Sequence, residues 1–233
     1  MILARPFDTL GSNDQTWLRA RLHFAVAGLG KPQHHALGAL RVWNHDEIAP
    51  GTGFPLHSHK DVEIVTYVWE GAITHRDSLG HTGRIEAGQL QAMSAGTGIR
   101  HAEFNAEAVT TKMFQIWFEP RSPGGEPRWQ TWKATSVSVE RQFRVLASGM
   151  DANADVLPIN ADARVLGVSM DAGGRVVHDL RRAKYAYLVP IGGRVRINGQ
   201  TFDAFGGIAA IGESDLVIEA LDRVQLVMVE AYE

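Results

Sequence analysis

Two short stretches of the chain each place metal-binding side chains two residues apart. One is His57-x-His59 and the other is His101-x-Glu103. On a β-strand, residues i and i+2 face the same side, so each stretch could direct both of its side chains to one point. Three imidazoles and one carboxylate are ligands that a divalent transition metal accepts in proteins. The residues between the stretches contain hairpin-like strands that could bring them together, which predicts a site for one metal ion.

A second carboxylate, that of Glu63, competes with Glu103 for the fourth ligand position. If the strand that contains His57 continued without a bulge, His57, His59 and Glu63 would share one face. Glu103 needs no further strand, because it lies two residues from His101. The spacing favours Glu103 as the ligand. Glu63 is then expected to orient a ligand imidazole, and either carboxylate could accept a proton as the general base of a reaction.

The composition limits the classes of protein to consider. The 233 residues carry a formal net charge of -3 and include no cysteine, so disulfides, thiolate metal sites and a cysteine nucleophile are excluded. The net charge gives no basic surface for nucleic acid. No apolar run approaches the length of a membrane span, and the start of the chain lacks the apolar segment of a secretory signal. We expect a cytoplasmic protein with neither nucleic acid nor a membrane as a partner.

Short apolar segments alternate with turn residues along the whole chain. Val62–Trp69, Ala72–Arg76 and Lys112–Phe118 are rich in β-branched and aromatic residues, and glycine or proline separates many such segments. Short strands at regular spacing are typical of a sandwich or a barrel, and helical periodicity is scarce. The sequence therefore predicts an all-β protein.

A segment rich in proline and glycine, residues 120–127, divides the chain, because it cannot lie inside a sheet. The part after it repeats the part before it at low resolution, with Val65–His75 aligned to Tyr187–Ile197. Such a repeat suggests the duplication of one β-barrel domain. We therefore predict two domains, one of residues 1–125 and one of residues 126–233.

The repeat also bears on where a metal could bind. The second part has a single histidine, His178, near the position that corresponds to His57 and His59. It has no counterpart of the segment that holds His101 and Glu103. A metal site is therefore expected in the first domain only.

The surroundings of the candidate ligands match two known motifs. Gly51, five residues, His57-x-His59 and a glutamate after three more residues follow the first cupin motif. Gly98-x-x-His101-x-x-x-Asn105 follows the end of the second cupin motif. Over about residues 38 to 120 the chain closely resembles the pirin family, and the bacterial pirin-like proteins with quercetin 2,3-dioxygenase activity in particular. The segments that carry this resemblance are His57–Tyr67, His75–Gly80 and Ser94–Asn105.

The resemblance to pirins implies a bicupin, that is, two β-barrels of the double-stranded β-helix (jelly-roll) type in tandem. It implies that the first barrel holds one metal through three histidines and one glutamate, which in this sequence are His57, His59, His101 and Glu103. Donors without a thiolate suit Fe(II), which we favour, and also Mn, Ni, Cu or Zn. The implied reaction opens the heterocyclic ring of a flavonol such as quercetin, so the expected partners are a small aromatic substrate and O2.

Two other functions stay open. Pirin itself is described as a metal-dependent regulator that binds other proteins, so a non-enzymatic role with a protein partner is one alternative. A different cupin activity that needs no oxygen, such as that of an isomerase, is the other.

Other polar residues of the first part have weaker patterns. His75 and Asp77 sit at a predicted hairpin, which favours a solvated turn. Gln115 lies between apolar neighbours on a predicted strand and faces either the barrel interior or water. Four further histidines lack the spacing of ligands and are expected at the surface: His34, His35, His45 and His81.

Overall fold

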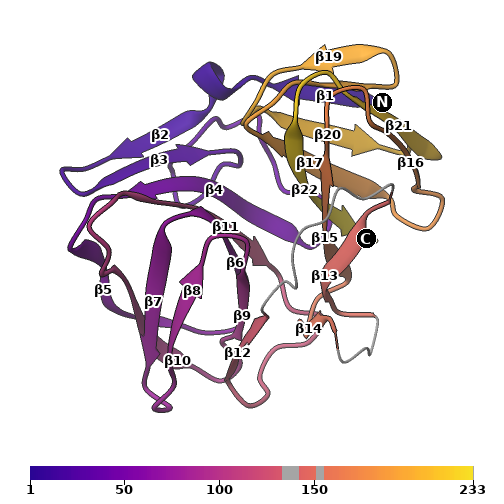
Figure 1. The fold of residues 1–233 in the computed structure, drawn as a ribbon. Helices are drawn as coiled ribbons and strands as arrows, with labels where there is room; N and C mark the ends of the chain where they lie inside the picture. The colour runs from indigo at the N-terminus through magenta and orange to yellow at the C-terminus, as the bar shows by residue number, and fades with distance from the viewer. Residues whose placement is uncertain (133–141, 151–154, 233) are drawn as a thin grey trace.

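The computed structural model describes residues 1–132, 142–150 and 155–232. Its strands form two β-barrels, and each barrel consists of a seven-stranded and a four-stranded sheet (Figure 1). In the described part of the chain the one helical element is a 3-10 helix, η1 (Phe7–Thr9). The predicted all-β fold of two barrels is therefore confirmed.

The first barrel consists of the strands from β2 to β11, which precede the loop at residues 120–127, and of β12, which follows it. The strands are β2 (Gly11–Asp14), β3 (Leu18–Leu22), β4 (Leu40–Ile48), β5 (Thr52–His59), β6 (Glu63–Glu70), β7 (Ala72–Asp77), β8 (Thr82–Glu86), β9 (Leu90–Ser94), β10 (Ile99–Asn105), β11 (Thr111–Phe118) and β12 (Arg128–Trp132). The seven-stranded sheet has the order β12-β9-β6-β11-β4-β3-β2, and the four-stranded sheet has the order β5-β10-β7-β8.

The second barrel repeats this plan with shorter strands. The strands are β1 (Ile2–Arg5), β13 (Arg144–Ser148), β14 (Leu157–Pro158), β15 (Ala163–Met170), β16 (Arg175–Asp179), β17 (Tyr185–Ile191), β18 (Val195–Ile197), β19 (Gln200–Phe202), β20 (Gly207–Ile211), β21 (Asp215–Ala220) and β22 (Val224–Ala231). Its seven-stranded sheet has the order β1-β20-β17-β22-β15-β13-β14, and its four-stranded sheet has the order β16-β21-β18-β19.

Each barrel takes a strand from beyond the boundary that we predict at residue 125. Strand β1, at the start of the chain, pairs with β20 of the second barrel. Strand β12, which follows the proline-rich loop, pairs with β9 of the first barrel (Figure 1). The loop does separate the two repeats, but the strand after it returns to the first barrel, so a cut at residue 125 would remove a strand from that barrel.

Strand β6 is buried on both of its faces along most of its length. Val65 and Tyr67 belong to a core that lies between the two barrels, whereas Ile64 and Val68 point into the first barrel. A strand with a side-chain period of two can contribute to both cores only if it lies between them. Strand β11 alternates in the same way, with Phe114 in the core between the barrels and Met113 inside the first barrel.

The core between the barrels joins the two repeats through aromatic side chains. Trp43 and Tyr187, which come from different barrels, are both fully buried, and their ring centroids lie 5.5 Å apart. Trp43 also contacts Phe114 of its own barrel at 5.3 Å. Aromatic pairs of this kind contribute roughly 0.5–1.5 kcal/mol each beyond the burial of their area. One hydrophobic cluster therefore contains residues of both barrels.

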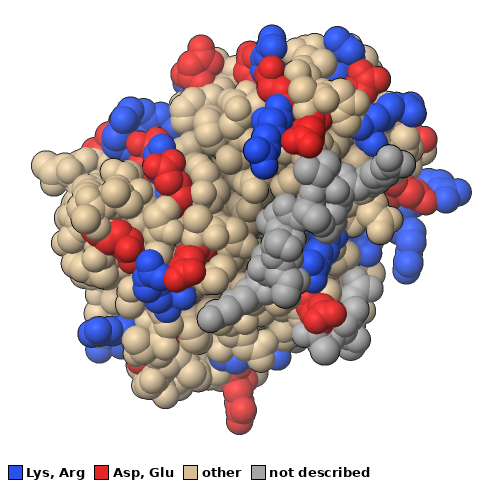
Figure 2. Space-filling view, viewed as in Figure 1, with Lys and Arg blue, Asp and Glu red and all other residues tan. Residues whose placement is uncertain are grey.

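Charged side chains of both signs lie on the surface of the molecule (Figure 2). On the face shown in Figure 2, basic and acidic side chains are interspersed, and those drawn in colour form no continuous basic patch. Among the residues that the structure describes, no helix has the length and apolar character to cross a membrane.

Candidate metal centre

Strands β5 and β10 are neighbours, and their pairing brings the two metal-binding stretches together. His57 of β5 is the register partner of His101 of β10, and His59 pairs with Ile99. The register shifts between His101 and Glu103, so that Glu103 lies opposite Phe54. Both stretches are therefore held on one sheet of the first barrel by the hydrogen bonds of a single strand pair.

Three imidazole rings meet on this sheet. The ring centroid of His57 lies 4.5 Å from that of His101 and 4.7 Å from that of His59. The centroids of His59 and His101 are 5.0 Å apart. One nitrogen of each ring lies within 4.8 Å of the others, which is a spacing at which one ion could contact all three.

The hydrogen bonds of the three rings leave nitrogens free for a metal. The Nε2 atoms of His59 and His101 are buried and have no hydrogen-bond partner in the described part of the chain. The Nδ1–H group of His57 donates a hydrogen bond to the carbonyl oxygen of Pro55 at 2.7 Å, which leaves Nε2 for a metal. Burial and the neighbouring imidazoles lower the pKa of His59 to about 4 and that of His101 to about 3. The rings of His59 and His101 are therefore neutral at pH 7, as metal ligation requires, and the residues present fit a metal.

Glu103 is buried in the interior of the first barrel. It is 1% exposed, and burial raises the pKa of its carboxyl to about 7 against the effect of three hydrogen bonds. Gln91 donates to Oε1 at 2.5 Å, Thr66 donates to the same oxygen at 3.4 Å, and Gln115 donates to Oε2. The structure thus places Gln115 in the barrel interior, which was one of its two expected positions.

The structure brings Glu103 to His101 but groups it with a different third residue. A carboxylate oxygen of Glu103 and ring nitrogens of His101 and His75 lie within 4.8 Å of one another. Among the described residues, two groups of three possible ligands therefore share His101: one with His57 and His59, the other with His75 and Glu103. The four ligands implied by the resemblance are thus adjacent, with His101 as the common member.

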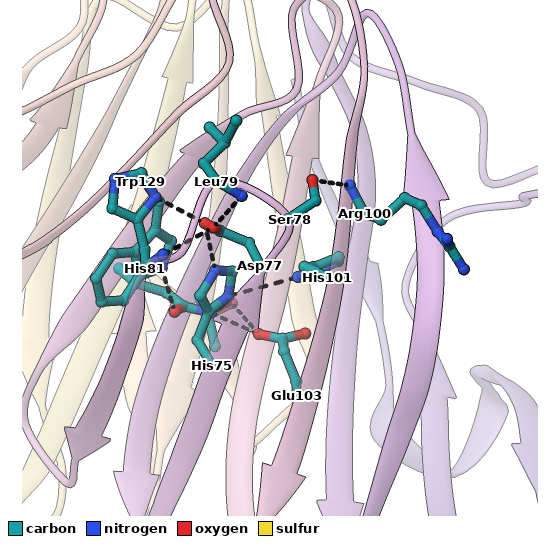
Figure 3. A network of polar contacts seen from close by, with 11 residues as sticks. His75, Asp77, Ser78, Leu79, His81, Arg100, His101, Glu103 and Trp129 are labelled. Carbon is teal, nitrogen blue, oxygen red and sulfur yellow. Dashed lines mark hydrogen bonds and ion pairs between the residues drawn. The ribbon is translucent and has the colours of Figure 1, made fainter.

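His75 and Asp77 are buried, so the expectation of a solvated turn is wrong. Neither side chain is exposed, and Nε2 of His75 lies 3.1 Å from Oδ2 of Asp77. The other carboxylate oxygen of Asp77 accepts hydrogen bonds from the backbone N–H groups of Leu79 and His81, which closes the turn around the side chain. On the far side, Nδ1 of His75 lies 3.5 Å from Nδ1 of His101 (Figure 3). The sequence did contain one indication of this contact: His75 and Asp77 are two residues apart on β7 and therefore face the same side of the strand.

The structure places Glu63 away from the imidazoles. Its carboxylate accepts hydrogen bonds from the hydroxyl of Ser94 at 2.7 Å and from the backbone N–H of Asn160 at 2.9 Å. The chain turns at Asp61, where φ is +49°, so that Glu63 starts β6 in the other sheet. Glu63 and Val65 then share the face that meets the second barrel. In this arrangement the Glu63 carboxylate is hydrogen-bonded to Ser94 and Asn160 and to none of the three ligand imidazoles.

Two further polar residues, on β4, were not expected in the interior. His45 is 3% exposed instead of lying at the surface, because its ring contacts Phe7, Trp69 and Phe205. Asp46 is 1% exposed, and both of its carboxylate oxygens lack a hydrogen-bond partner within the described ranges. Burial, together with the charge of Glu103, raises the pKa of Asp46 to about 8. No spacing in the sequence pointed to Asp46.

An all-β chain of two similar barrels, with an imidazole cluster on adjacent strands of one barrel, is a bicupin. The family model described as Pirin matches residues 4–118, and the model of the quercetinase C-terminal cupin domain matches residues 145–231. The chain belongs to the pirin family.

Named relatives extend over nearly the whole chain. A pirin-like protein of Caulobacter vibrioides is 49% identical over 231 residues, which cover 99% of this chain and 100% of that protein. The quercetin 2,3-dioxygenase of Escherichia coli is 34% identical over 221 residues, which cover 94% of each chain. The crystal structure of the bacterial pirin YhhW from Escherichia coli in complex with nickel(II) aligns with a TM-score of 0.92 and 31% identity, covering 100% of this chain and 99% of that one.

Proposed function

We propose that the chain is a metal-dependent dioxygenase that opens the heterocyclic ring of flavonols such as quercetin with O2. The observation that carries the proposal is the cluster of three imidazoles, two of them with buried Nε2 atoms that lack a hydrogen-bond partner in the described part of the chain, beside a buried carboxylate. We assign the metal to His57, His59, His101 and Glu103. The relative named quercetin 2,3-dioxygenase and the nickel complex of a pirin support this assignment.

The donor set favours a metal that accepts nitrogen and oxygen ligands. It contains no thiolate, so it suits Fe(II), which we favour, and Mn, Ni, Cu or Zn. A divalent metal held there supplies a Lewis acid, which lowers the pKa of a coordinated hydroxyl group. The chain itself supplies the ligand positions through the antiparallel pairing of β5 with β10.

Glu103 is the residue to which we assign proton acceptance from the flavonol hydroxyl. In the metal-free protein burial raises the pKa of this carboxyl to about 7, and its place beside His101 would put a proton acceptor at the metal centre. The hydrogen bonds from Gln91, Gln115 and Thr66 hold both carboxylate oxygens in place, so the proton acceptor needs no reorientation during the reaction.

Aromatic side chains flank the imidazoles and could hold a flat substrate. The ring of Trp117 lies 5.0 Å from that of His59, nearly perpendicular to it. The ring of Phe54 lies 6.4 Å from that of His57. Both aromatic side chains are partly exposed, so their remaining surface is available to a bound molecule. A mostly apolar wall with few polar groups is typical of sites for small aromatic ligands.

Oxygen uptake tests the proposed activity. Quercetin is bound anaerobically to the metal-loaded protein, oxygen is then admitted, and the loss of flavonol and of O2 is followed together. We expect equal consumption of both by the wild type and none by His101→Ala. His35→Ala, which changes an exposed histidine away from the cluster, is the matched control and should retain activity.

A metal-loaded wild type that binds quercetin without consuming O2 contradicts the dioxygenase. That result would favour the oxygen-independent or regulatory alternatives. Equal turnover by His101→Ala and the wild type would contradict the assigned site.

A further inference from the structure

We propose that Trp129, on β12, is a positioning residue that fixes His101 and Glu103 at the metal centre. The inference rests on the proposed metal site and adds a residue outside the two metal-binding stretches. Strand β12 follows the proline-rich loop and pairs with β9, with Trp129 as the register partner of Met93. From this position its indole ring reaches into the polar network of the first barrel (Figure 3).

The first contact of Trp129 fixes His75. The indole and imidazole rings are stacked, with centroids 4.7 Å apart and an angle of 9° between their planes. His75 is held at its Nε2 by Asp77, at 3.1 Å. If that nitrogen carries the proton, Nδ1 of His75 is an acceptor directed at Nδ1 of His101, 3.5 Å away. His101 then keeps its proton on Nδ1, and its Nε2 is the atom free to bind a metal.

The second contact of Trp129 fixes Gln91. The indole Nε1–H donates to Oε1 of Gln91 at 2.8 Å. With its amide oxygen engaged in this way, Gln91 must present its amide nitrogen to the other side. That nitrogen donates to Oε1 of Glu103 at 2.5 Å. An amide whose orientation is fixed by one partner gives a second partner a hydrogen bond of fixed direction.

One side chain therefore acts on both His101 and Glu103. The position of the indole is itself well determined, because Gly83 leaves the space that it fills: a Cβ atom at Gly83 would lie 2.2 Å from Trp129. Trp117 forms a similar contact to Gln115, at 3.3 Å, but it comes from the same strand as that glutamine. Trp129 differs in that it comes from the strand beyond the proline-rich loop.

Nickel affinity is the measurement that tests this role in the full-length chain. Nickel(II) is titrated in competition with a chelator of known affinity for wild type, Trp129→Phe and Trp129→Leu. Outer-shell partners typically change metal affinity by about 10- to 100-fold. We expect a loss within this range for Trp129→Phe, which keeps an aromatic ring but lacks the N–H, and a larger loss for Trp129→Leu. Trp132→Phe, on the same strand, is the matched control and should bind nickel as the wild type does.

A double substitution separates positioning from a general effect on folding. If Trp129 acts through Gln91, the nickel affinity lost in Trp129→Phe combined with Gln91→Met is less than the sum of the two separate losses. The thermal unfolding of each metal-free variant shows whether the barrel is intact, and Trp129→Phe decides the question if Trp129→Leu does not fold.

Two results would overturn the inference: wild-type nickel affinity in a folded Trp129→Phe, or fully additive losses in the double variant. Both results are distinct from a failure of the metal site, in which the wild type itself binds no nickel. They are also distinct from a failure of the dioxygenase, in which nickel binds but no oxygen is consumed.

Discussion

A buried polar atom without a hydrogen-bond partner lowers the stability of the folded state, so such atoms in the first barrel need a physical reason. The Nε2 atoms of His59 and His101 belong to imidazoles that cluster, and the proposed metal would account for them. The carboxylate of Asp46 is also without a partner in the described ranges, yet it belongs to neither group of possible ligands. The burial of the Asp46 carboxylate therefore costs free energy of folding that binding of the proposed metal would not offset.

Substitution of Asp46 by asparagine tests this cost through its dependence on pH. The pKa of Asp46 is raised from 3.8 to about 8 in the folded state, so the folded protein binds more protons than the unfolded one between these values. Its contribution to stability is present below about pH 4 and is lost as pH rises toward 8. We expect Asp46→Asn to be more stable than the metal-free wild type at pH 8, by on the order of a few kcal/mol, with the difference shrinking toward pH 5.

Urea unfolding of the two metal-free proteins at pH 5, 6.5 and 8 measures this difference. A constant gap in the free energy of unfolding over this range would show that the carboxyl of Asp46 does not titrate differently on folding.

Spacing predicted that His57 and His59 share one face of a strand and that His101 and Glu103 share another, because alternation on a strand is local. It could not show that His75 is buried, because that depends on the indole that stacks on its ring from a strand more than fifty residues further along the chain.

At the scale of elements, the site depends on how closely β5 approaches β10. Gly53 lies against the backbone of β10, and a Cβ atom there would be 2.2 Å from the carbonyl oxygen of Glu103 and 2.6 Å from Cα of Phe104. The register shift between His101 and Glu103 lies in the same stretch of the pair. A bulge of this kind follows from contacts across strands, so the sequence pattern of β10 did not predict it.

Gly53→Ala should separate β5 from β10. We expect a loss of about 1–3 kcal/mol in the free energy of unfolding, the usual cost of a forced contact, and a weaker affinity for nickel. Gly206→Ala is the control, because its nearest neighbour would lie at 3.4 Å, an ordinary contact distance. Equal melting temperatures and equal nickel affinities for the two variants would contradict the importance of the close approach.

At the scale of the whole molecule, the two barrels are joined by a shared core and by exchanged strands. Duplication was visible in the sequence, because strand and turn patterns repeat. The exchange of β1 and β12 was not visible, because strand partners are chosen by contacts far apart in the chain. Glu63 shows the same limit. The sequence allowed Glu63 to continue the strand of His57 and His59, but in the structure it begins β6, which belongs to the other sheet of the first barrel.

Glu63→Ala tests the contact between the barrels. The substitution leaves the hydroxyl of Ser94 and the N–H of Asn160 without their acceptor. We expect a loss of about 1–3 kcal/mol in the free energy of unfolding, a smaller loss for Glu63→Gln, which keeps one oxygen, and unchanged nickel affinity in both. A nickel affinity that falls with Glu63→Ala while stability holds would instead place Glu63 at the metal centre.

The central claim is that one metal ion binds to His57, His59, His101 and Glu103. Anomalous diffraction from crystals of the nickel-loaded protein tests it most directly. We expect one strong peak per chain, at about 2 Å from the ring nitrogens of the three histidines and from a carboxylate oxygen of Glu103. A peak held by His75 without His57 and His59, a peak in the second barrel, or no peak at full nickel loading would contradict the account.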